Sequence, residues 1–357
     1  LALRYSSGVR GVSTLFIWIG SFWILAAQLI GCAIVLEIVL GWPRWLGGLT
    51  ATLIVTAYFS AGGLLSSAWV NRIQDFIVVA GFAIAVPLAI SFAGGWDTVQ
   101  EANAGQMNFW RGSQPNIGWP LIFLLAPSFF LSPGLVQRAF AARDERALTR
   151  GIAMSGVALM IFAFLPTLLG MAARAQFPDL TAAQQTQALP LLLQSGVPAL
   201  IGAFVLVAVF AAEISSADAV LFMLSTSGAQ DLYKRFINTS ATDGQVLRVA
   251  RLVAVLAGVV GYVLVFLIGT VMGALQVFYE VLVVSLFVPI LGALLLERPS
   301  TAGAYAGICA GLTVLAVAWF RSWTGYGWAT PVFVALLVSC AAFAAGSLAF
   351  RPRRVTG

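Results

Sequence analysis

Hydrophobic residues form long runs along this chain, separated by short polar segments. Ten runs are long enough to cross a bilayer, which takes roughly 20 residues of helix. They lie near residues 12–40, 45–61, 73–93, 117–136, 152–173, 197–227, 249–269, 275–296, 303–320 and 329–350. This pattern predicts an all-α polytopic membrane protein with ten transmembrane helices in one domain, residues 1–357.

Composition supports a membrane protein and argues against enzyme chemistry. The sequence is 61% hydrophobic and 9% charged, with a mean hydropathy of +0.97, whereas soluble domains carry about 25% charged residues. Histidine is absent, and Cys32, Cys309 and Cys340 show neither disulfide parity nor metal-ligand spacing. We therefore expect no enzyme activity and no bound cofactor.

The distribution of basic residues predicts the orientation in the membrane. The net charge of +6 would also suit an acidic partner such as nucleic acid. Ten spans, however, place both termini on one side, and all but four of the 19 Lys and Arg residues fall on that side. The exceptions are Arg44, Arg111, Arg174 and Arg321. By the positive-inside rule we expect cytoplasmic termini, a plasma or inner membrane location and no nucleic-acid partner.

The sixth run contains a polar cluster within an otherwise apolar span. Residues 211–219 read Ala-Ala-Glu-Ile-Ser-Ser-Ala-Asp-Ala, with two carboxylates and two adjacent hydroxyls. A charge at the bilayer centre costs roughly 2.5–3.5 kcal/mol even on lenient scales, so such residues usually face a cavity or an ion path. The pattern favours an ion-coupled carrier.

The fourth run is predicted to be kinked or broken. It contains Pro120, Pro127 and Pro133, together with Ser128 and Ser132. Each proline removes a backbone donor and clashes with the preceding turn. A broken helix at the midplane would offer backbone groups to a solute or ion, and a kinked packing helix is the alternative.

Two long segments on the predicted outer side join the spans, at residues 94–116 and 176–196. The first carries Trp96, Phe109 and Trp110, which suit the membrane interface. We interpret both segments as loops that rest on lipid, with a lid over an outer mouth as the alternative.

Several short motifs occur in a fixed order along nearly the whole chain. They are Leu3-Arg4-Tyr5, Gln28-Leu29-Ile30-Gly31, Tyr58-Phe59-Ser60-Ala61-Gly62-Gly63, Trp69-Val70-Asn71-Arg72-Ile73-Gln74, Gln137-Arg138, Ala141-Ala142, residues 211–218 and Asp231-Leu232-Tyr233. Each motif alone is weak. Their order and spacing together resemble the sodium/solute symporter family, which includes the sodium–glucose, proline and pantothenate symporters.

The resemblance implies a five-plus-five inverted-repeat bundle of the leucine-transporter type, with extra peripheral helices. Residues 12–40 resemble the third core helix of that bundle. The repeat is therefore expected to be incomplete in this sequence, with the first two core helices and a peripheral helix upstream of Leu1.

The resemblance also implies a sodium site on the sixth run. It assigns as ligands the carbonyl oxygen of Ala212 and the hydroxyls of Ser215 and Ser216. Helical spacing puts Asp218 on the same stripe as Ala212 and Ser215, where it would raise cation affinity or accept a hydrogen bond from Ser215. The alternative is that both serines bond to carbonyls of their own helix.

Three acids lie within the predicted spans: Glu213, Asp218 and Glu280. We expect one of them to handle the cation or the solute. The other two are expected to be structural, and either Glu213 or Glu280 is a candidate for a neutral, hydrogen-bonded carboxyl.

The resemblance suggests further residues on the solute path or at its gates. Many family members carry Asp where this chain has Asn71, which favours one sodium ion per cycle. Ser132 and Pro133, with Ser128 nearby, look more like members that carry amino acids or small carboxylates than like sugar carriers.

Together these observations predict a sodium-coupled secondary symporter that imports a small organic solute by alternating access. Its partners would be the solute, the sodium ion and the lipid bilayer. Two alternatives stay open. One is a truncated remnant that cannot transport, and the other is a membrane solute sensor.

Overall fold

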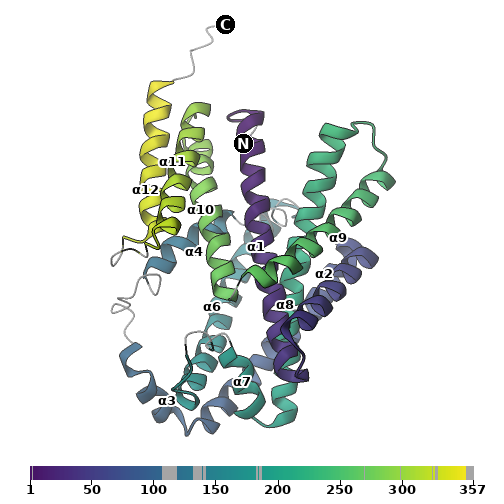
Figure 1. The fold of residues 1–357 in the computed structure, drawn as a ribbon, viewed down its shortest axis with the longest axis vertical. Helices are drawn as coiled ribbons and strands as arrows, with labels where there is room; N and C mark the ends of the chain where they lie inside the picture. Colours follow the sequence, from purple (N-terminus) through teal and green to yellow (C-terminus); the bar gives the residue numbers. More distant parts are fainter. Residues whose placement is uncertain are drawn as a thin grey trace. The chain divides into compact units, whose positions relative to one another are not determined.

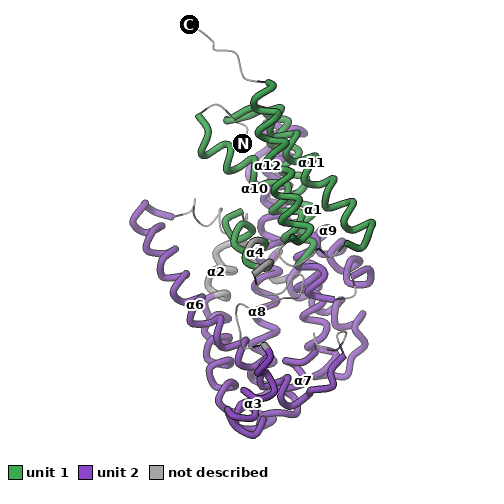
Figure 2. The backbone as a smooth tube through the Cα atoms, turned by 90° about the vertical axis from the view of Figure 1, so that its left-hand side faces the viewer, with its two compact units in different colours: residues 1–21, 108–138, 276–357 green, residues 22–107, 139–275 purple. Residues whose placement is uncertain are grey.

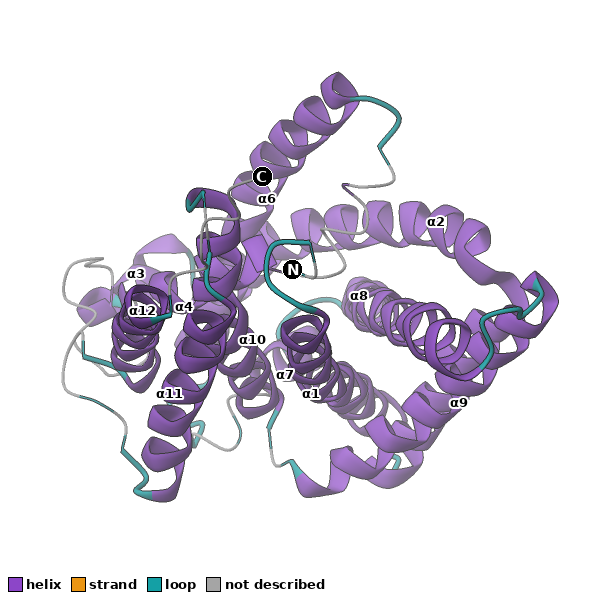
Figure 3. Cartoon of the chain, turned by 90° about the horizontal axis from the view of Figure 1, so that it is seen from above, coloured by secondary structure: helices purple, strands orange, loops and turns teal. Residues whose placement is uncertain are grey.

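The protein was analysed as a computed structural model that describes most of the chain. The described residues are 1, 3–106, 119–131, 139, 142–181, 184, 187–268, 270–297, 299–323, 325 and 329–350. Side chains are not described at residues 58, 60–71, 119–121 and 123. Within this part of the chain the extended regular elements are all helical (Figure 3).

The long helices coincide with apolar runs of the sequence, and Figure 1 labels the helices along the chain. They are α1 (Ser7–Leu40), α2 (Arg44–Phe92), α3 (Trp96–Ala102), η1 (Ala104–Gln106), α4 (Trp119–Leu131), α6 (Glu145–Gln176), α7 (Ala188–Ser195), α8 (Ala199–Thr226), η4 (Ser227–Ile237), α9 (Asp243–Leu267), α10 (Val271–Leu295), α11 (Thr301–Phe320) and α12 (Pro331–Ala349). In the described chain, 8 helices are long and apolar enough to cross a membrane.

Two of the predicted spans differ from the helices in the structure. Residues 45–61 and 73–93 were expected to be separate helices, yet α2 runs continuously from Arg44 to Phe92. No proline occurs between residues 44 and 86, so no residue there lacks the backbone donor that the helix needs.

Of residues 117–136, the structure describes α4 with Pro127 inside it. Ser132 and Pro133 lie outside the described residues.

The chain divides into two compact units, which are coloured separately in Figure 2. Unit 1 contains residues 1–21, 108–138 and 276–357. Unit 2 contains residues 22–107 and 139–275. The core of unit 2 is α2 packed against α8, with α6 and α9 also packed on α2. In unit 1, α11 packs along α12, and α4 also contacts α12.

The described parts of the two long connecting segments, residues 94–106, 176–181, 184 and 187–196, contribute buried residues to the core of unit 2. Trp96 is 44% exposed, and Phe109 and Trp110 lie outside the described residues. Val99 of α3 and both Leu192 and Leu193 of α7 have no exposed surface. Asn103 follows α3, and its Nδ2 donates to the carbonyl oxygens of Val99 (2.7 Å) and Met171 (3.1 Å). The segment therefore docks on α6 through a buried amide.

Unit 1 joins α11 to α12 through a row of glycines. Gly303, Gly307 and Gly311 recur every fourth residue, the spacing that lets membrane helices approach closely. A Cβ atom built on Gly303 would lie 2.7 Å from the carbonyl oxygen of Phe343. Because that oxygen belongs to the α12 backbone, no side-chain rotation can make room.

We expect Gly303→Ala to destabilise the protein by about 1–3 kcal/mol, the usual cost of overpacking. Thermal unfolding in detergent measures the loss. The matched control is Gly156→Ala on α6, where an added Cβ meets nothing within 4 Å. The control should be neutral or slightly stabilising, because alanine favours helix over glycine. Equal effects of the two changes would contradict the packing account.

The segment before α1 is tied to the end of α10. The Nε of Arg4 donates to the carbonyl oxygen of Ala293 (2.8 Å), and its Nη2 donates to that of Leu296. The Tyr5 hydroxyl donates to the carbonyl oxygen of Pro289 (2.7 Å), and burial raises the pKa of Tyr5 to about 12. A cation thus satisfies carbonyls that a helix C-terminus leaves unpaired.

Candidate functional site

The polar cluster of the sixth run lies in the middle of α8. Its side chains differ in burial around the helix. Asp218 has no exposed surface, Ser215 and Ala212 are partly buried, and Ser216 is exposed. One helix therefore presents a carboxylate to the protein interior and a hydroxyl to its surface.

Ser216 makes no hydrogen bond within the described part of the chain, in contrast to several hydroxyls on the long helices; unlike the unbonded hydroxyls of Ser13, Thr56, Ser339 and Ser347, which are buried, it is on an exposed residue. The usual arrangement there is a hydroxyl that donates to a carbonyl three or four residues earlier. It is seen for Thr14, Ser21, Thr52, Ser128, Thr167, Ser225, Ser285 and Thr313. The Ser216 hydroxyl is therefore available to an external ligand.

Asp218 lies on the face of α8 that packs against α2. Phe222, one turn further along the same face, has its ring centroid 6.4 Å from that of Phe59 on α2. The Asp218 carboxylate is thus placed inside unit 2, away from the exposed Ser216. Beyond Phe222 the helix widens into η4, an 11-residue π-helical segment.

Glu213 reaches the neighbouring helix α1 at a glycine. A Cβ atom built on Gly31 would lie 2.6 Å from Cδ of Glu213 and 2.7 Å from its Oε1. The carboxyl group therefore lies directly against the α1 backbone, where only glycine leaves room. The motif Gln28-Leu29-Ile30-Gly31 was identified in the sequence, but nothing in it revealed the partner.

Glu280 lies in unit 1, on α10, and its carboxyl group is held by two donors. The Nε2 of Gln276 donates to Oε1 and the indole Nε1 of Trp319 donates to Oε2, both at 2.8 Å. Only 3% of the residue is exposed. The Trp319 bond joins α10 to α11, which favours a structural role for this acid.

The remaining candidates are only partly described. Ser128 is buried, and its hydroxyl donates to the carbonyl oxygen of Leu125 (2.7 Å), so it bonds to its own helix. Asn71 lies on α2, but its side chain is outside the described residues, as are Ser132 and Pro133.

Comparison with known proteins gives consistent matches. A family model described as the sodium:solute symporter family matches residues 1–311. The sodium/glucose cotransporter of Vibrio parahaemolyticus is 26% identical over 69% of this chain and 51% of its own length. The high-affinity choline transporter 1 of Homo sapiens is 28% identical over 73% and 48%. The high-affinity proline transporter of Bacillus subtilis is 24% identical over 82% and 63%.

A solved structure shows the fold. It is a substrate-bound, outward-open Na⁺-coupled sialic acid symporter, with a TM-score of 0.76 and 19% identity. The match covers 98% of this chain and 76% of that one. This chain spans about half the length of the curated glucose and choline relatives that it matches.

Proposed function

This chain belongs to the sodium:solute symporter family, and we propose that the native protein imports a small organic solute together with sodium by alternating access. The observation that carries the proposal is the exposed, unbonded hydroxyl of Ser216 beside Ser215 on a helix apolar enough to span the membrane. Such a hydroxyl is a ready oxygen ligand in a region where water is scarce.

We propose that Ala212, Ser215 and Ser216 supply oxygens to the sodium ion. In an α-helix the carbonyl of Ala212 accepts the backbone N–H of Ser216, and its second lone pair stays available. Two hydroxyls and one carbonyl provide hard oxygen ligands without a formal negative charge at the ion. We place the remaining ligands on the family's first core helix, as the resemblance implies.

Sodium binding would be coupled to the solute through the conformational equilibrium. A ligand shifts a two-state equilibrium only by its differential affinity for the two states. If the ion and the solute both bind best to the closed state, closure requires both, and an inward sodium gradient drives uptake. Rocking of one helix bundle about a midplane site is the usual way to achieve this.

We propose an amino acid or a small carboxylate as the solute, with one sodium ion per cycle. The support is the Ser132-Pro133 motif and the presence of Asn71 instead of Asp. The relatives are named for glucose, choline and proline, so the family alone leaves the solute open.

Thermal unfolding of the purified full-length protein tests the solute class. Proline, other amino acids and short carboxylates should raise the melting temperature in NaCl but not in KCl, because a ligand of the native state stabilises it. Glucose, choline and sialic acid serve as comparisons. Stabilisation by a sugar alone, at equal concentration, would contradict the assignment.

A further inference from the structure

Unit 2 contains a cavity of about 370 Å³ that the transport proposal does not use. It lies between α2, α8, η4 and α9. Phe59 and Phe222, whose rings contact each other, are among its lining residues. The α9 wall carries Asp243, Leu247 and Arg251.

These three α9 residues follow each other at intervals of four, so they share one face of the helix. At a rise of about 1.5 Å per residue, Asp243 and Arg251 are separated by about 12 Å along the axis. The carboxylate is at the first residue of α9, and the guanidinium is two turns further in. An α-amino acid, whose charges are much closer together, cannot match both groups.

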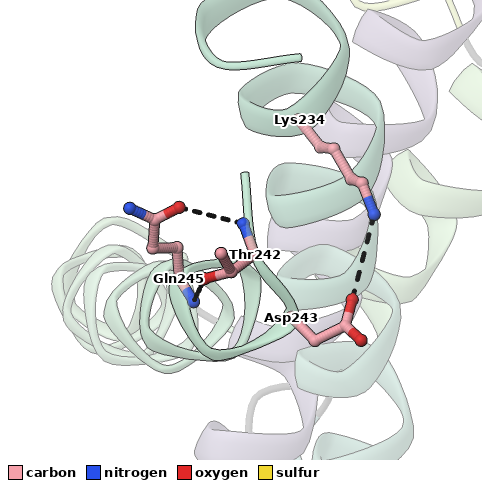
Figure 4. Close-up of polar contacts among 4 residues, drawn as sticks. All are labelled: Lys234, Thr242, Asp243 and Gln245. Atoms are coloured by element: carbon pink, nitrogen blue, oxygen red, sulfur yellow. Dashed lines mark hydrogen bonds and ion pairs between the residues drawn. The ribbon is translucent and has the colours of Figure 1, made fainter. Parts of the chain in front are cut away.

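The charge of Asp243 is partly compensated within the protein. Lys234 of η4 places its Nζ 4.0 Å from Oδ1 of Asp243 (Figure 4). A reciprocal cap fixes the start of α9, because the Thr242 backbone N–H donates to Oε1 of Gln245 (2.9 Å) while the Gln245 N–H donates to the Thr242 hydroxyl. Figure 4 shows this cap beside the Lys234–Asp243 pair at the start of α9.

Arg251 is the remaining cation of the cavity. It is exposed, and within the described residues it makes no ion pair. Asp243 is fully exposed and lies about 12 Å from Arg251 along the axis, so among the described residues the guanidinium has no ion-pair partner. Such a group forms two parallel hydrogen bonds with a phosphate.

The helix face continues from Arg251 as an apolar strip. Val255 and Val259 follow at intervals of four and are 43% and 53% exposed. The neighbouring Leu252 and Leu256 are also exposed. A ligand with a phosphate at Arg251 could therefore lay a hydrocarbon chain along α9.

We propose that this cavity binds the headgroup of an anionic phospholipid of the cytoplasmic leaflet. The phosphate would bind Arg251, the headgroup would fill the cavity against Phe59 and Phe222, and an acyl chain would lie along Val255 and Val259. Basic pockets between transmembrane helices on the cytoplasmic side are suited to anionic headgroups. The exposed cations Arg235 and Arg248, on the two helices η4 and α9 that line the cavity, would add long-range attraction.

The test is a titration of the purified full-length protein with dioctanoyl phosphatidylglycerol, read by thermal shift and by native mass spectrometry. We expect Arg251→Gln to weaken binding about tenfold or more, because a charge-assisted contact is lost. Arg248→Gln, an exposed cation on the same helix that does not line the cavity, should stay within about twofold of the wild type. Ala250→Leu, which fills the cavity but keeps Arg251, should also weaken binding.

Three results would overturn the proposal. The first is equal binding by Arg251→Gln and wild type, and the second is equal binding of dioctanoyl phosphatidylcholine. The third is the same stabilisation by inorganic phosphate alone, which would indicate a free-anion site. If Arg251→Gln does not fold, unchanged binding by Ala250→Leu would still contradict a lipid in this cavity. The readout is binding, so it does not depend on the transported solute.

Discussion

Alanine at both Ser215 and Ser216 is expected to raise the sodium concentration for half-maximal uptake by roughly tenfold to a hundredfold. The change removes two oxygens from the proposed ion site. An interaction with a charged group is worth about 1.5–3 kcal/mol, and each 1.4 kcal/mol is tenfold in affinity. Uptake by the full-length protein in proteoliposomes, at a series of sodium concentrations, measures the shift.

The matched control is Ser285→Ala on α10. Its hydroxyl donates to the carbonyl oxygen of Val281 (2.6 Å), so it is satisfied within its own helix. Removal of this hydroxyl can change expression or stability, but it should leave the sodium dependence of uptake unchanged. The single variant Ser216→Ala should give part of the effect of the double variant. An unshifted sodium curve in the double variant would remove these serines from the ion site.

The second large effect is expected at Trp319. Phenylalanine there removes the indole N–H that bonds to Glu280, and leaves one oxygen of a buried carboxyl group without this donor. The expected loss of stability is about 1–3 kcal/mol, the cost of an unsatisfied buried polar group. Thermal or denaturant unfolding in detergent measures the loss.

A double-mutant cycle separates the hydrogen bond from the lost ring volume. Glu280→Leu combined with Trp319→Phe should be less destabilising than the sum of the two single changes. Trp45→Phe on α2 is the control for the same chemical change, since the structure shows no bond from that indole among the described residues. Additive effects at Glu280 and Trp319 would show that the bond contributes nothing, and Glu280 would return to the candidates for the solute path.

Much of the fold follows from hydrophobicity, because a bilayer requires long apolar helices. The family assignment was also reached from short motifs, and the matched model over residues 1–311 confirms it. The hydrophobic pattern led to wrong predictions where contacts between helices determine the structure. The α2 helix continues through the predicted break, and α3 and α7 bury Val99, Leu192 and Leu193 in unit 2.

The site was predicted less completely than the fold. The polar cluster on α8 was found because charge in an apolar run is conspicuous. The contacts of Glu213 with Gly31 and of Glu280 with Trp319 were not found, because these residues are far apart in sequence and neither Gly31 nor Trp319 carries a local signal. Gln276, one turn before Glu280, is the partner that helical spacing could have revealed. The ligand roles of Ala212, Ser215 and Ser216 stay predictions.

The most direct test of sodium-coupled symport is solute accumulation by the full-length protein in proteoliposomes under an imposed inward sodium gradient. The proposal predicts that the solute rises above its outside concentration, and that this accumulation collapses when an ionophore removes the gradient. A potassium gradient of the same size should not replace it. Sodium-dependent binding without accumulation would contradict symport and indicate a solute sensor.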